Sequence, residues 1–150
     1  MAVADTEQVI RLYRQLDDWH VLLYPDIFTV LDDDTSSAYS LLRIERFPDI
    51  LVAQREGTVV GFVQLYVRKT GDSPVDNPLE YAQVDNIVVD ERHRGIGFGR
   101  ALLDAAKDWA KARGIRRLRV GVYSTNTPAV RVYEKAGFEP LITVLEMKIA

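Results

Sequence analysis

The sequence contains no cysteine. This absence excludes disulfides, thiolate metal sites and any covalent intermediate on a cysteine side chain. Histidine is almost as rare: the two histidines, His20 and His93, stand far apart in the sequence and do not suggest a metal site. We therefore expect a protein without a metal cofactor.

Long apolar runs and an excess of positive charge are also missing. No run approaches the about 20 apolar residues that cross a bilayer, and no signal peptide is recognisable. The expectation is a cytoplasmic protein with no membrane partner. A net charge of −3 argues against general binding of nucleic acid. With 150 residues, 47% of them hydrophobic, the chain is predicted to form a single domain, 1–150, around a real core.

Apolar periodicity and capping residues predict alternating helices and strands. The expected helices cover 5–24, 37–46, 99–113 and 128–136. The expected strands cover 50–55, 58–67, 81–89, 118–123 and a closing strand at 141–149. A helix connects the strands 81–89 and 118–123, so these two strands should be parallel. The fold class is therefore α/β, with a mixed sheet.

A glycine-rich loop joins an apolar strand to an amphipathic helix between Val88 and Leu103. Glycines let a ligand approach the backbone, and the first turn of a helix offers unpaired N–H groups with a partial positive charge. The stretch is therefore a candidate anion cradle, with phosphate or pyrophosphate as the natural guest. A P-loop is excluded because it requires a lysine that is absent here. A dinucleotide fingerprint requires a glycine where Arg100 stands.

Two motifs in this order resemble one family. Arg94, Gly97 and Gly99 follow the Arg-x-x-Gly-x-Gly pattern of the acetyl-CoA loop in the GCN5-related N-acetyltransferases, the GNAT superfamily. The second stretch, from Asn126 to Phe138, resembles the Asn-x-x-Ala-x-x-x-Tyr-x-x-x-Gly-Phe segment of the same family. Each motif alone is a weak to moderate signal, whereas the pair at this separation is strong evidence.

The resemblance implies a GNAT fold, a mixed sheet with helices on both sides, and acetyl-CoA as acetyl donor. Because little precedes the first helix, the first strand of that fold should be short or absent. By the resemblance, backbone amides of the loop would hold the coenzyme's pyrophosphate, and the strand edge would pair with its pantetheine arm. The residues expected to bind the coenzyme are Ile87, Val88, Val89, Arg94, Gly95, Ile96, Gly97, Phe98, Gly99, Arg100, Asn126, Ala129 and Tyr133.

Tyr133 matches the family's proton donor. A phenol with a pKa of about 10 can protonate the sulfur that leaves from a thioester. The plain alternative is a tyrosine that packs on an amphipathic helix. Asp85 is the candidate general base, or else a surface or bulge aspartate, with Glu80 and Tyr81 as outside candidates. Some relatives that acetylate protein N-termini carry a glutamate where this chain has Gly121, which counts against that mechanism.

The acceptor is expected to lie near the first helix and the loop after it, where His20 and Tyr24 are candidate contacts. The aspartates at 32–34 could bind a cationic substrate, although a helix cap is the commoner role of such a run. The sequence thus predicts direct transfer of an acetyl group to a primary amine of a small molecule or protein. A non-catalytic module that binds CoA and a nucleotide-binding protein are the alternatives. A homodimer is compatible with the resemblance.

Overall fold

One four-stranded sheet organises the computed structural model, which describes residues 1–150, with strands in the order β1-β2-β3-β4. β1 (Asp49–Arg55) pairs antiparallel with β2 (Thr58–Thr70), and β2 pairs antiparallel with β3 (Leu79–Val89). β4 (Leu118–Val120) is parallel to β3, as the intervening helix predicted. The mixed sheet of the predicted α/β class is confirmed.

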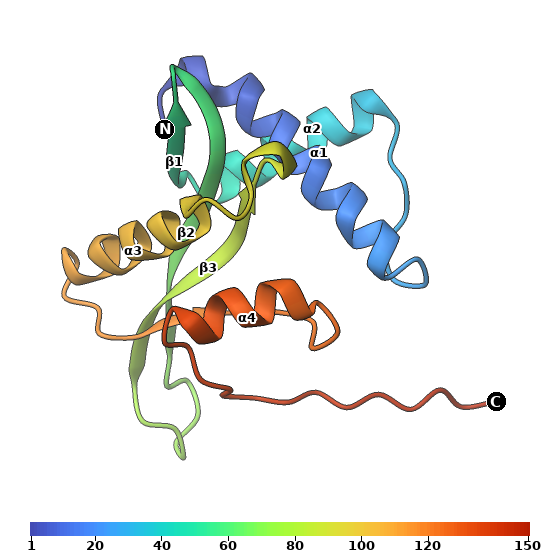
Figure 1. Cartoon of the computed structure of the whole chain (residues 1–150). Helices are drawn as coiled ribbons and strands as arrows, with labels where there is room; N and C mark the ends of the chain where they lie inside the picture. Colours follow the sequence, from blue (N-terminus) through green and yellow to red (C-terminus); the bar gives the residue numbers. More distant parts are fainter.

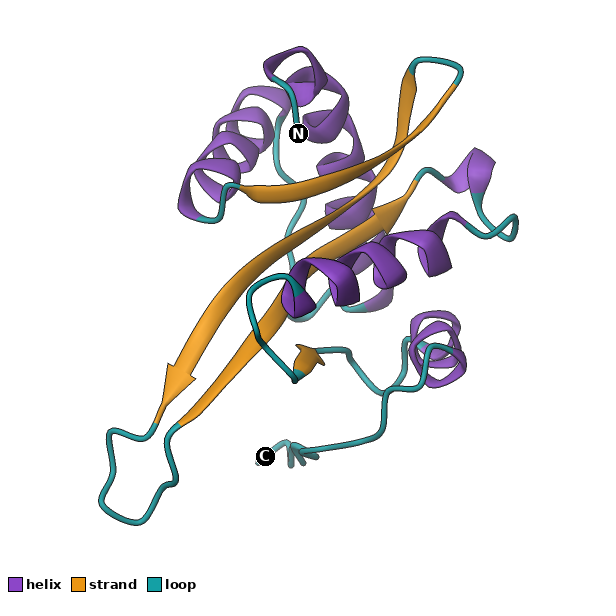
Figure 2. Ribbon diagram, turned by 90° about the vertical axis from the view of Figure 1, so that its left-hand side faces the viewer, coloured by secondary structure: helices purple, strands orange, loops and turns teal.

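Four α-helices surround this sheet (Figures 1 and 2). They are α1 (Thr6–Leu23), α2 (Asp33–Arg46), α3 (Phe98–Lys111) and α4 (Thr127–Lys135). Two short 3-10 turns complete the regular structure, η1 (Val3–Asp5) and η2 (Glu91–His93). None of the helices is long and apolar enough to cross a membrane.

The core has two layers because strand side chains alternate between the faces of the sheet. Val63 and Leu65 of β2 contact the buried face of α3, whereas their neighbour Phe62 packs against α1. Both layers are tightly closed: Phe62, Val63 and Leu65 are each 0% exposed. The helices α1 and α3 therefore fix the position of the sheet from opposite sides.

Local capping signals in the sequence set the helix starts. Asp32 accepts a hydrogen bond from the Thr35 backbone N–H at 2.9 Å, so the aspartate run is a helix cap and α2 begins at Asp33. Asn126 caps α4 in the same way, with its Oδ1 3.4 Å from the Ala129 nitrogen. These bonds satisfy amide groups that the first helical turn leaves free.

Three of the predicted strand positions can be compared with the ends of the observed sheet. No strand precedes α1 within residues 1–150, where η1 forms instead. β4 ends at Val120, three residues before its predicted end. The predicted closing strand 141–149 is wrong, because residues 139–150 form no regular structure and extend from the body of the molecule (Figure 1). A strand needs a paired neighbour, and this segment has none in the single chain.

A β-bulge interrupts the pairing of β2 with β3. Gln64 pairs with Asn86, and the adjacent Leu65 pairs with Val84, so Asp85 is the additional residue. Bulges re-aim side chains and frequently lie beside active sites. The extra residue also shifts by one position the alternation of β3 backbone groups that face β2.

Candidate active site

The backbone of the glycine loop at the end of β3 is accessible from outside the protein. Gly95 and Gly97 adopt positive φ angles of 78° and 101°, a conformation that favours glycine. A Cβ atom at either position would meet no atom within 4 Å, so space lies in front of both peptide units. The backbone of the loop is therefore accessible at both glycines, as the approach of a phosphate group requires.

The helix that follows this loop adds anion-binding capacity. Gly97 is the N-cap of α3 and supplies no side-chain cap. The first intrahelical bond at this end runs from the Ala101 N–H to the Gly97 carbonyl, so the N–H groups of Phe98, Gly99 and Arg100 have no acceptor within the helix. These donors and the helix dipole point toward the open side of the loop. The predicted pyrophosphate-binding residues thus fit that group.

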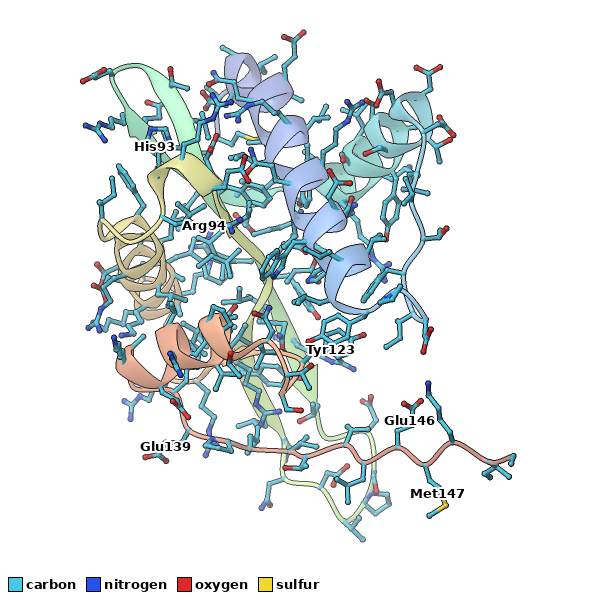
Figure 3. All side chains as sticks on the ribbon, turned by 45° about the vertical axis from the view of Figure 1, so that its right-hand side comes forward. His93, Arg94, Tyr123, Glu139, Glu146 and Met147 are labelled. Atoms are coloured by element: carbon cyan, nitrogen blue, oxygen red, sulfur yellow. The ribbon has the colours of Figure 1, made fainter.

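Two arginines of the loop region already have protein partners. The Arg94 Nε donates to the Val89 carbonyl at 3.0 Å, and its guanidinium lies 5.8 Å from the centre of the Trp19 ring (Figure 3 labels Arg94). Arg100 pairs with Asp104 at 3.1 Å and donates to the Lys135 carbonyl of α4 at 2.8 Å. Arg100 thus offers its backbone amide to a phosphate while its side chain ties α3 to α4.

Only alternate residues at the end of β3 present their backbone groups to the free edge of the strand. The Asp90 N–H donates to Val60 of β2, so alternate residues from Asp90 backward face β2, and Ile87 and Val89 face the other edge. Val88 faces β2: its backbone carbonyl lies against Gly61 of that strand, and its side chain is 5% exposed in the core.

The start of the loop is anchored to α1. Asp90 is only 4% exposed, and its Oδ2 accepts from Arg11 NH1 at 2.6 Å. Burial tends to raise the pKa of the Asp90 carboxyl, but hydrogen bonds from Arg11 and from the Arg92 backbone outweigh it and hold that pKa below its ordinary value. His93 Nδ1, 3.9 Å from Asp90 Oδ1, is buried without a hydrogen-bond partner. The buried carboxylate holds the loop against the first helix.

The second motif lies beside the first one. A Cβ atom at Gly99 would be 4.0 Å from the Val132 Cγ1 of α4, and the Arg100 bond to Lys135 joins the same two helices. Asn126 and Ala129 occupy the first turn of α4, and Tyr133 follows one turn later. Tertiary structure therefore brings together the two motifs that sequence alone could only pair by resemblance.

Tyr133 has the surroundings of a phenol that stays protonated. Burial is the sole cause that raises the pKa of Tyr133 to about 12. Its ring packs edge-on against Phe138 at 5.7 Å between centres, and its hydroxyl makes no hydrogen bond to another protein group. A neutral O–H donor without a protein acceptor is available to a ligand.

Asp85 belongs to a polar network on the α1 and α2 side of the sheet. Its Oδ2 accepts from Asn86 Nδ2 at 2.7 Å, and the same amide group contacts Gln64 Oε1 at 3.2 Å. Desolvation by the surrounding groups raises the pKa of the Asp85 carboxyl, although the residue is exposed, and the guanidinium groups of Arg46 and Arg43 oppose this shift. The raised pKa and the bulge suit a proton acceptor, and no hydrogen bond or ion pair connects Asp85 with Tyr133.

An aromatic cluster lies at the C-terminal end of α1. His20 stacks on Phe28 at 5.1 Å, and burial lowers the pKa of His20. The Tyr24 ring lies 4.3 Å from that of Tyr123, between ring centres, and its hydroxyl is 2.7 Å from Thr125 Oγ1. The cluster thus connects the expected acceptor contacts, His20 and Tyr24, with the loop that leads to α4.

Sequence reasoning missed three members of this region, Phe28, Tyr123 and Thr125. Tyr123 and Thr125 lie about 100 residues along the chain from the end of α1 that they contact, since Tyr24 and Thr125 are separated by 101 positions. The only local signal was the density of aromatic residues between 19 and 28. Side-chain contacts over such separations follow from the sheet topology and not from a local pattern.

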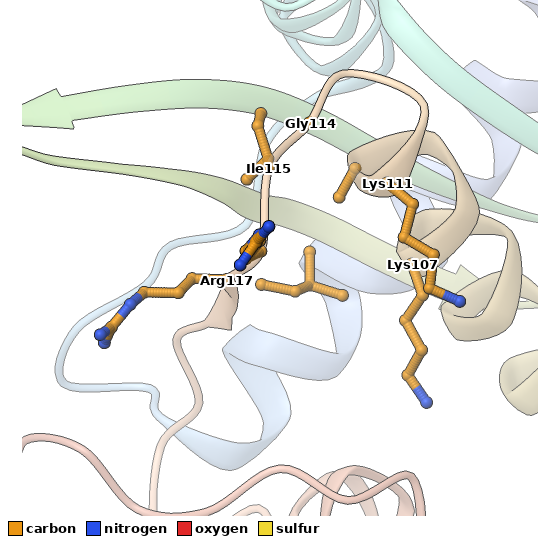
Figure 4. A pocket seen from close by; sticks show the side chains of 8 residues that line it. Lys107, Lys111, Gly114, Ile115 and Arg117 are labelled. Atoms are coloured by element: carbon orange, nitrogen blue, oxygen red, sulfur yellow. The ribbon is translucent and has the colours of Figure 1, made fainter.

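A separate hollow of about 540 Å³ lies at the other end of α3 from the glycine loop. Figure 4 shows Lys107, Lys111 and Arg117 around it, with Ile115 at its wall. It contains none of the predicted site residues. No group of three or more histidine, cysteine, aspartate or glutamate side chains could hold a metal ion.

Comparison with known proteins assigns the family. The family model described as "Acetyltransferase (GNAT) family" matches residues 9–138. The chain belongs to the GNAT family. The match spans most of α1 and the loop after it, the glycine loop and the Asn126 to Phe138 motif, so the resemblance based on two motifs is confirmed.

Curated GNAT relatives carry acetyltransferase names. The IAA acetyltransferase of Azospirillum brasilense is 32% identical over 138 residues, covering 88% of this chain and 77% of the relative. The mycothiol acetyltransferase of Thermobispora bispora is 38% identical over 87 residues, covering 58% of this chain and 28% of the relative. The chain spans about a quarter to a third of the length of the first curated relatives that it matches.

Solved structures confirm the GNAT fold. A mutant of the BH1408 protein from Bacillus halodurans aligns with a TM-score of 0.89 at 23% identity, covering 100% of this chain and 97% of that one. AAC(6')-Iy, solved in complex with the bisubstrate analogue CoA-S-monomethyl-acetylneamine, aligns with a TM-score of 0.72 at 20% identity, covering 100% and 95%. At these identities the likeness concerns the fold alone.

Proposed function

We propose that this GNAT protein is an N-acetyltransferase that transfers the acetyl group of acetyl-CoA directly to a primary amine. The observation that carries the proposal is the open glycine loop at an uncapped helix start, in contact with the helix that bears Tyr133. The loop offers free amides to a pyrophosphate, and the neighbouring helix offers a neutral phenol. Family membership supports acetyl-CoA as the donor.

The proposed binding of the coenzyme uses main-chain groups. The amides from Gly95 to Arg100 hold the pyrophosphate, and the free β3 edge at Ile87 and Val89 pairs with the pantetheine arm. Because the Val89 carbonyl accepts from Arg94 here, that side chain leaves this acceptor when the arm binds. Asn126 and Ala129 line the other side. The coenzyme supplies the acetyl thioester.

The proposed chemistry needs one proton transfer at the acceptor amine and another at the leaving sulfur. Asp85, directly or through water, takes a proton from the acceptor ammonium, because an amine with a pKa near 10.4 is mostly protonated at neutral pH. The free amine then forms the C–N bond while the C–S bond breaks, and the nitrogen gives its surplus proton to water as the amide forms. Tyr133 donates its proton to the departing sulfur and regains one from solvent. Backbone amides of β3 stabilise the charge that develops on the carbonyl oxygen.

The proposed acceptor region lies around His20 and Tyr24, with Phe28 and Tyr123 as additional contacts. Aromatic faces can bind apolar or cationic parts of an acceptor. The relatives and structural neighbours named for streptothricin, a ribosomal protein alanine or aminoglycosides cover too wide a range of amines to select one. The acceptor class therefore stays at the level of a primary amine.

Acetyl transfer and coenzyme binding are tested separately. Calorimetry with CoA should give binding, and mass spectrometry with acetyl-CoA and a panel of small amines, amino acids, aminoglycosides and peptides should show a gain of one acetyl group. Initial rates with both substrates varied should give intersecting lines, and parallel lines would contradict direct transfer.

The alternative is a module that binds CoA without catalysis. It would bind CoA in calorimetry and acetylate no amine in the panel. The free Tyr133 hydroxyl favours the enzyme, since a module needs no proton donor. A nucleotide-binding protein would bind ATP in competition with acetyl-CoA, an outcome that the missing P-loop lysine opposes.

A further inference from the structure

Arg46 is an exposed cation without a counter-ion at the C-terminal end of α2. Its side chain forms no ion pair and no hydrogen bond, and its guanidinium lies 5.2 Å from the centre of the Phe47 ring. The nearby Arg43, by contrast, pairs with Asp17 and lies over two tyrosine rings. The two arginines therefore differ, because the Arg43 guanidinium is used by the fold and that of Arg46 is free for a ligand.

Hydrogen bonds connect the Asp85 carboxylate with this end of α2. The buried Gln64 side chain donates to the Phe47 carbonyl at 2.7 Å, and its Oε1 accepts from Asn86 Nδ2 at 3.2 Å. The same Asn86 amide donates to Asp85 Oδ2 at 2.7 Å. Two side chains thus link the carboxylate to the residue that directly follows Arg46.

The electrostatic effects of the two arginines agree with this placement. Desolvation raises the pKa of the Asp85 carboxyl, and the charge of Arg46 opposes the rise more strongly than that of Arg43. Burial lowers the pKa of His20, Asp17 opposes this shift, and Arg43 adds to it. The candidate base Asp85 and the expected acceptor contact His20 therefore share Arg43 as a neighbour, and Arg46 lies on the Asp85 side.

An aromatic pair lies beside the two charged groups. Phe47 stacks on Tyr66 of β2, with ring centres 4.2 Å apart and planes 12° apart, and both side chains are half-buried. Tyr66 stands two residues after Gln64 on β2, so both side chains point to the same face of the sheet. An acceptor that reaches Asp85 from this face therefore meets an apolar surface and a free guanidinium.

We infer that the acceptor is an amino acid, whose carboxylate binds Arg46 while its amine faces Asp85. The inference rests on the proposed function and narrows the acceptor from any primary amine to one that carries a carboxylate on the same small molecule. A planar guanidinium binds a carboxylate through two parallel hydrogen bonds. An acceptor with only cationic groups, such as a polyamine, would place an ammonium against Arg46 and is disfavoured. The product is the N-acetyl amino acid, with its carboxylate unchanged.

Matched acceptors test the role of the carboxylate. Mass spectrometry with acetyl-CoA and the common amino acids should show acetylation of at least one of them. The wild-type protein should prefer this amino acid by about tenfold or more in kcat/KM over its amide and over its decarboxylated amine. The amide has the less basic amine, so a preference for the amino acid cannot arise from a larger fraction of free amine.

The same panel separates this inference from the proposed function. Acetylation of aminoglycosides or peptides but of no amino acid would overturn the inference and leave the N-acetyltransferase in place. No acetylation of any amine would remove the proposed function, and the inference with it. Equal kcat/KM values for the amino acid and its decarboxylated amine would also overturn the inference, because the carboxylate would then contribute nothing.

Variants of Arg46 assign the contact to one side chain. Arg46→Gln should raise the KM for the amino acid by about ten- to a hundredfold and leave the KM for acetyl-CoA unchanged. Arg46→Lys keeps the charge without the paired donors and should recover part of the loss. The control is Arg55→Gln, at an exposed position in the last residue of β1, and it should keep both KM values.

A structural role of Arg46 predicts a different result. Arg46 lies in the last turn of α2, where a cation also stabilises the helix dipole, so thermal unfolding of each variant is measured alongside the kinetics. A loosened helix would impair every acceptor alike, whereas a lost carboxylate contact impairs only the amino acid. Equal losses in Arg46→Gln for the amino acid and for its decarboxylated amine would therefore refute the assignment.

Discussion

The Tyr24 hydroxyl lies 2.7 Å from Thr125 Oγ1, and the Tyr24 ring lies 4.3 Å from that of Tyr123, between ring centres. These contacts tie the end of α1 to the loop that leads into α4. They bring the expected acceptor region to the motif that carries Asn126, one residue after Thr125.

Substitutions of Tyr24 should affect the acceptor more than the coenzyme. Tyr24→Phe keeps the ring and removes one exposed hydrogen bond, so the free energy of unfolding should fall by about 0.5–1.5 kcal/mol at most. Tyr24→Ala removes the ring and should raise the KM for the acceptor while the KM for acetyl-CoA stays constant. Steady-state kinetics with each substrate varied measures both values, and a rise only in the KM for acetyl-CoA would refute this assignment.

Tyr133→Phe should lower turnover by about ten- to ten-thousand-fold, because it removes the proposed proton donor and keeps the ring that packs on Phe138. The pKa of about 12 means that the phenol is protonated throughout the neutral range, so its loss should depress the rate at every pH below that value. Tyr39→Phe, on the exposed surface of α2, is the control and should keep full turnover. Unchanged turnover in Tyr133→Phe would remove Tyr133 from the mechanism.

Gly97→Ala should weaken CoA binding about tenfold or more, because the methyl group disfavours the φ of 101° and displaces the amides of the loop. The backbone strain should also cost about 1–2 kcal/mol of unfolding free energy. Gly57→Ala is a matched control, since Gly57 has a φ of 79°, meets equally open space and lies in the turn between β1 and β2. It should lose similar stability in urea unfolding and retain CoA affinity in calorimetry, and equal affinities in the two variants would contradict the cradle.

Ionisation of the Asp85 carboxyl should raise activity and lower the stability of the fold. Its pKa is raised in the folded protein, so folding favours the protonated form, and this contribution is lost as the pH rises through the folded-state pKa. At neutral pH the carboxylate is therefore a cost, and Asp85→Asn should unfold at an equal or higher urea concentration while its turnover falls. The wild-type rate should rise with pH through the raised pKa, and this rise should vanish in the variant.

The control for Asp85 is Asp108→Asn, at an exposed position on α3 that pairs only with Lys111. It should change neither the pH profile nor the turnover. If Asp85→Asn retains wild-type turnover at neutral pH, another group or water alone takes the proton.

Local features of this protein were predictable because their physical causes are local. The positive φ angles of Gly95 and Gly97 follow from the freedom of glycine, and the caps at Asp32 and Asn126 follow from side chains that reach their own helix. The two-layer core followed in outline from apolar periodicity, which places alternate residues of β2 on opposite faces.

Features that depend on distant partners needed the tertiary structure. The bulge makes Asp85 an additional residue and turns Val88 toward β2, which strand periodicity without a register could not predict. The contact of Tyr24 with Thr125 joins positions 101 residues apart. The pattern at 141–149 was read as a strand, yet a strand exists only where a neighbour supplies hydrogen bonds, and this chain supplies none.

The sequence by itself determined the helices, the conformation of the glycine loop and the family, because these depend on short-range spacing and on the backbone preferences of single residues. The tertiary structure alone decided which strand edges are open, which motifs meet and which apolar side chains face water. Those outcomes depend on pairing and packing between residues far apart in the chain, where a small shift in register changes every contact that follows.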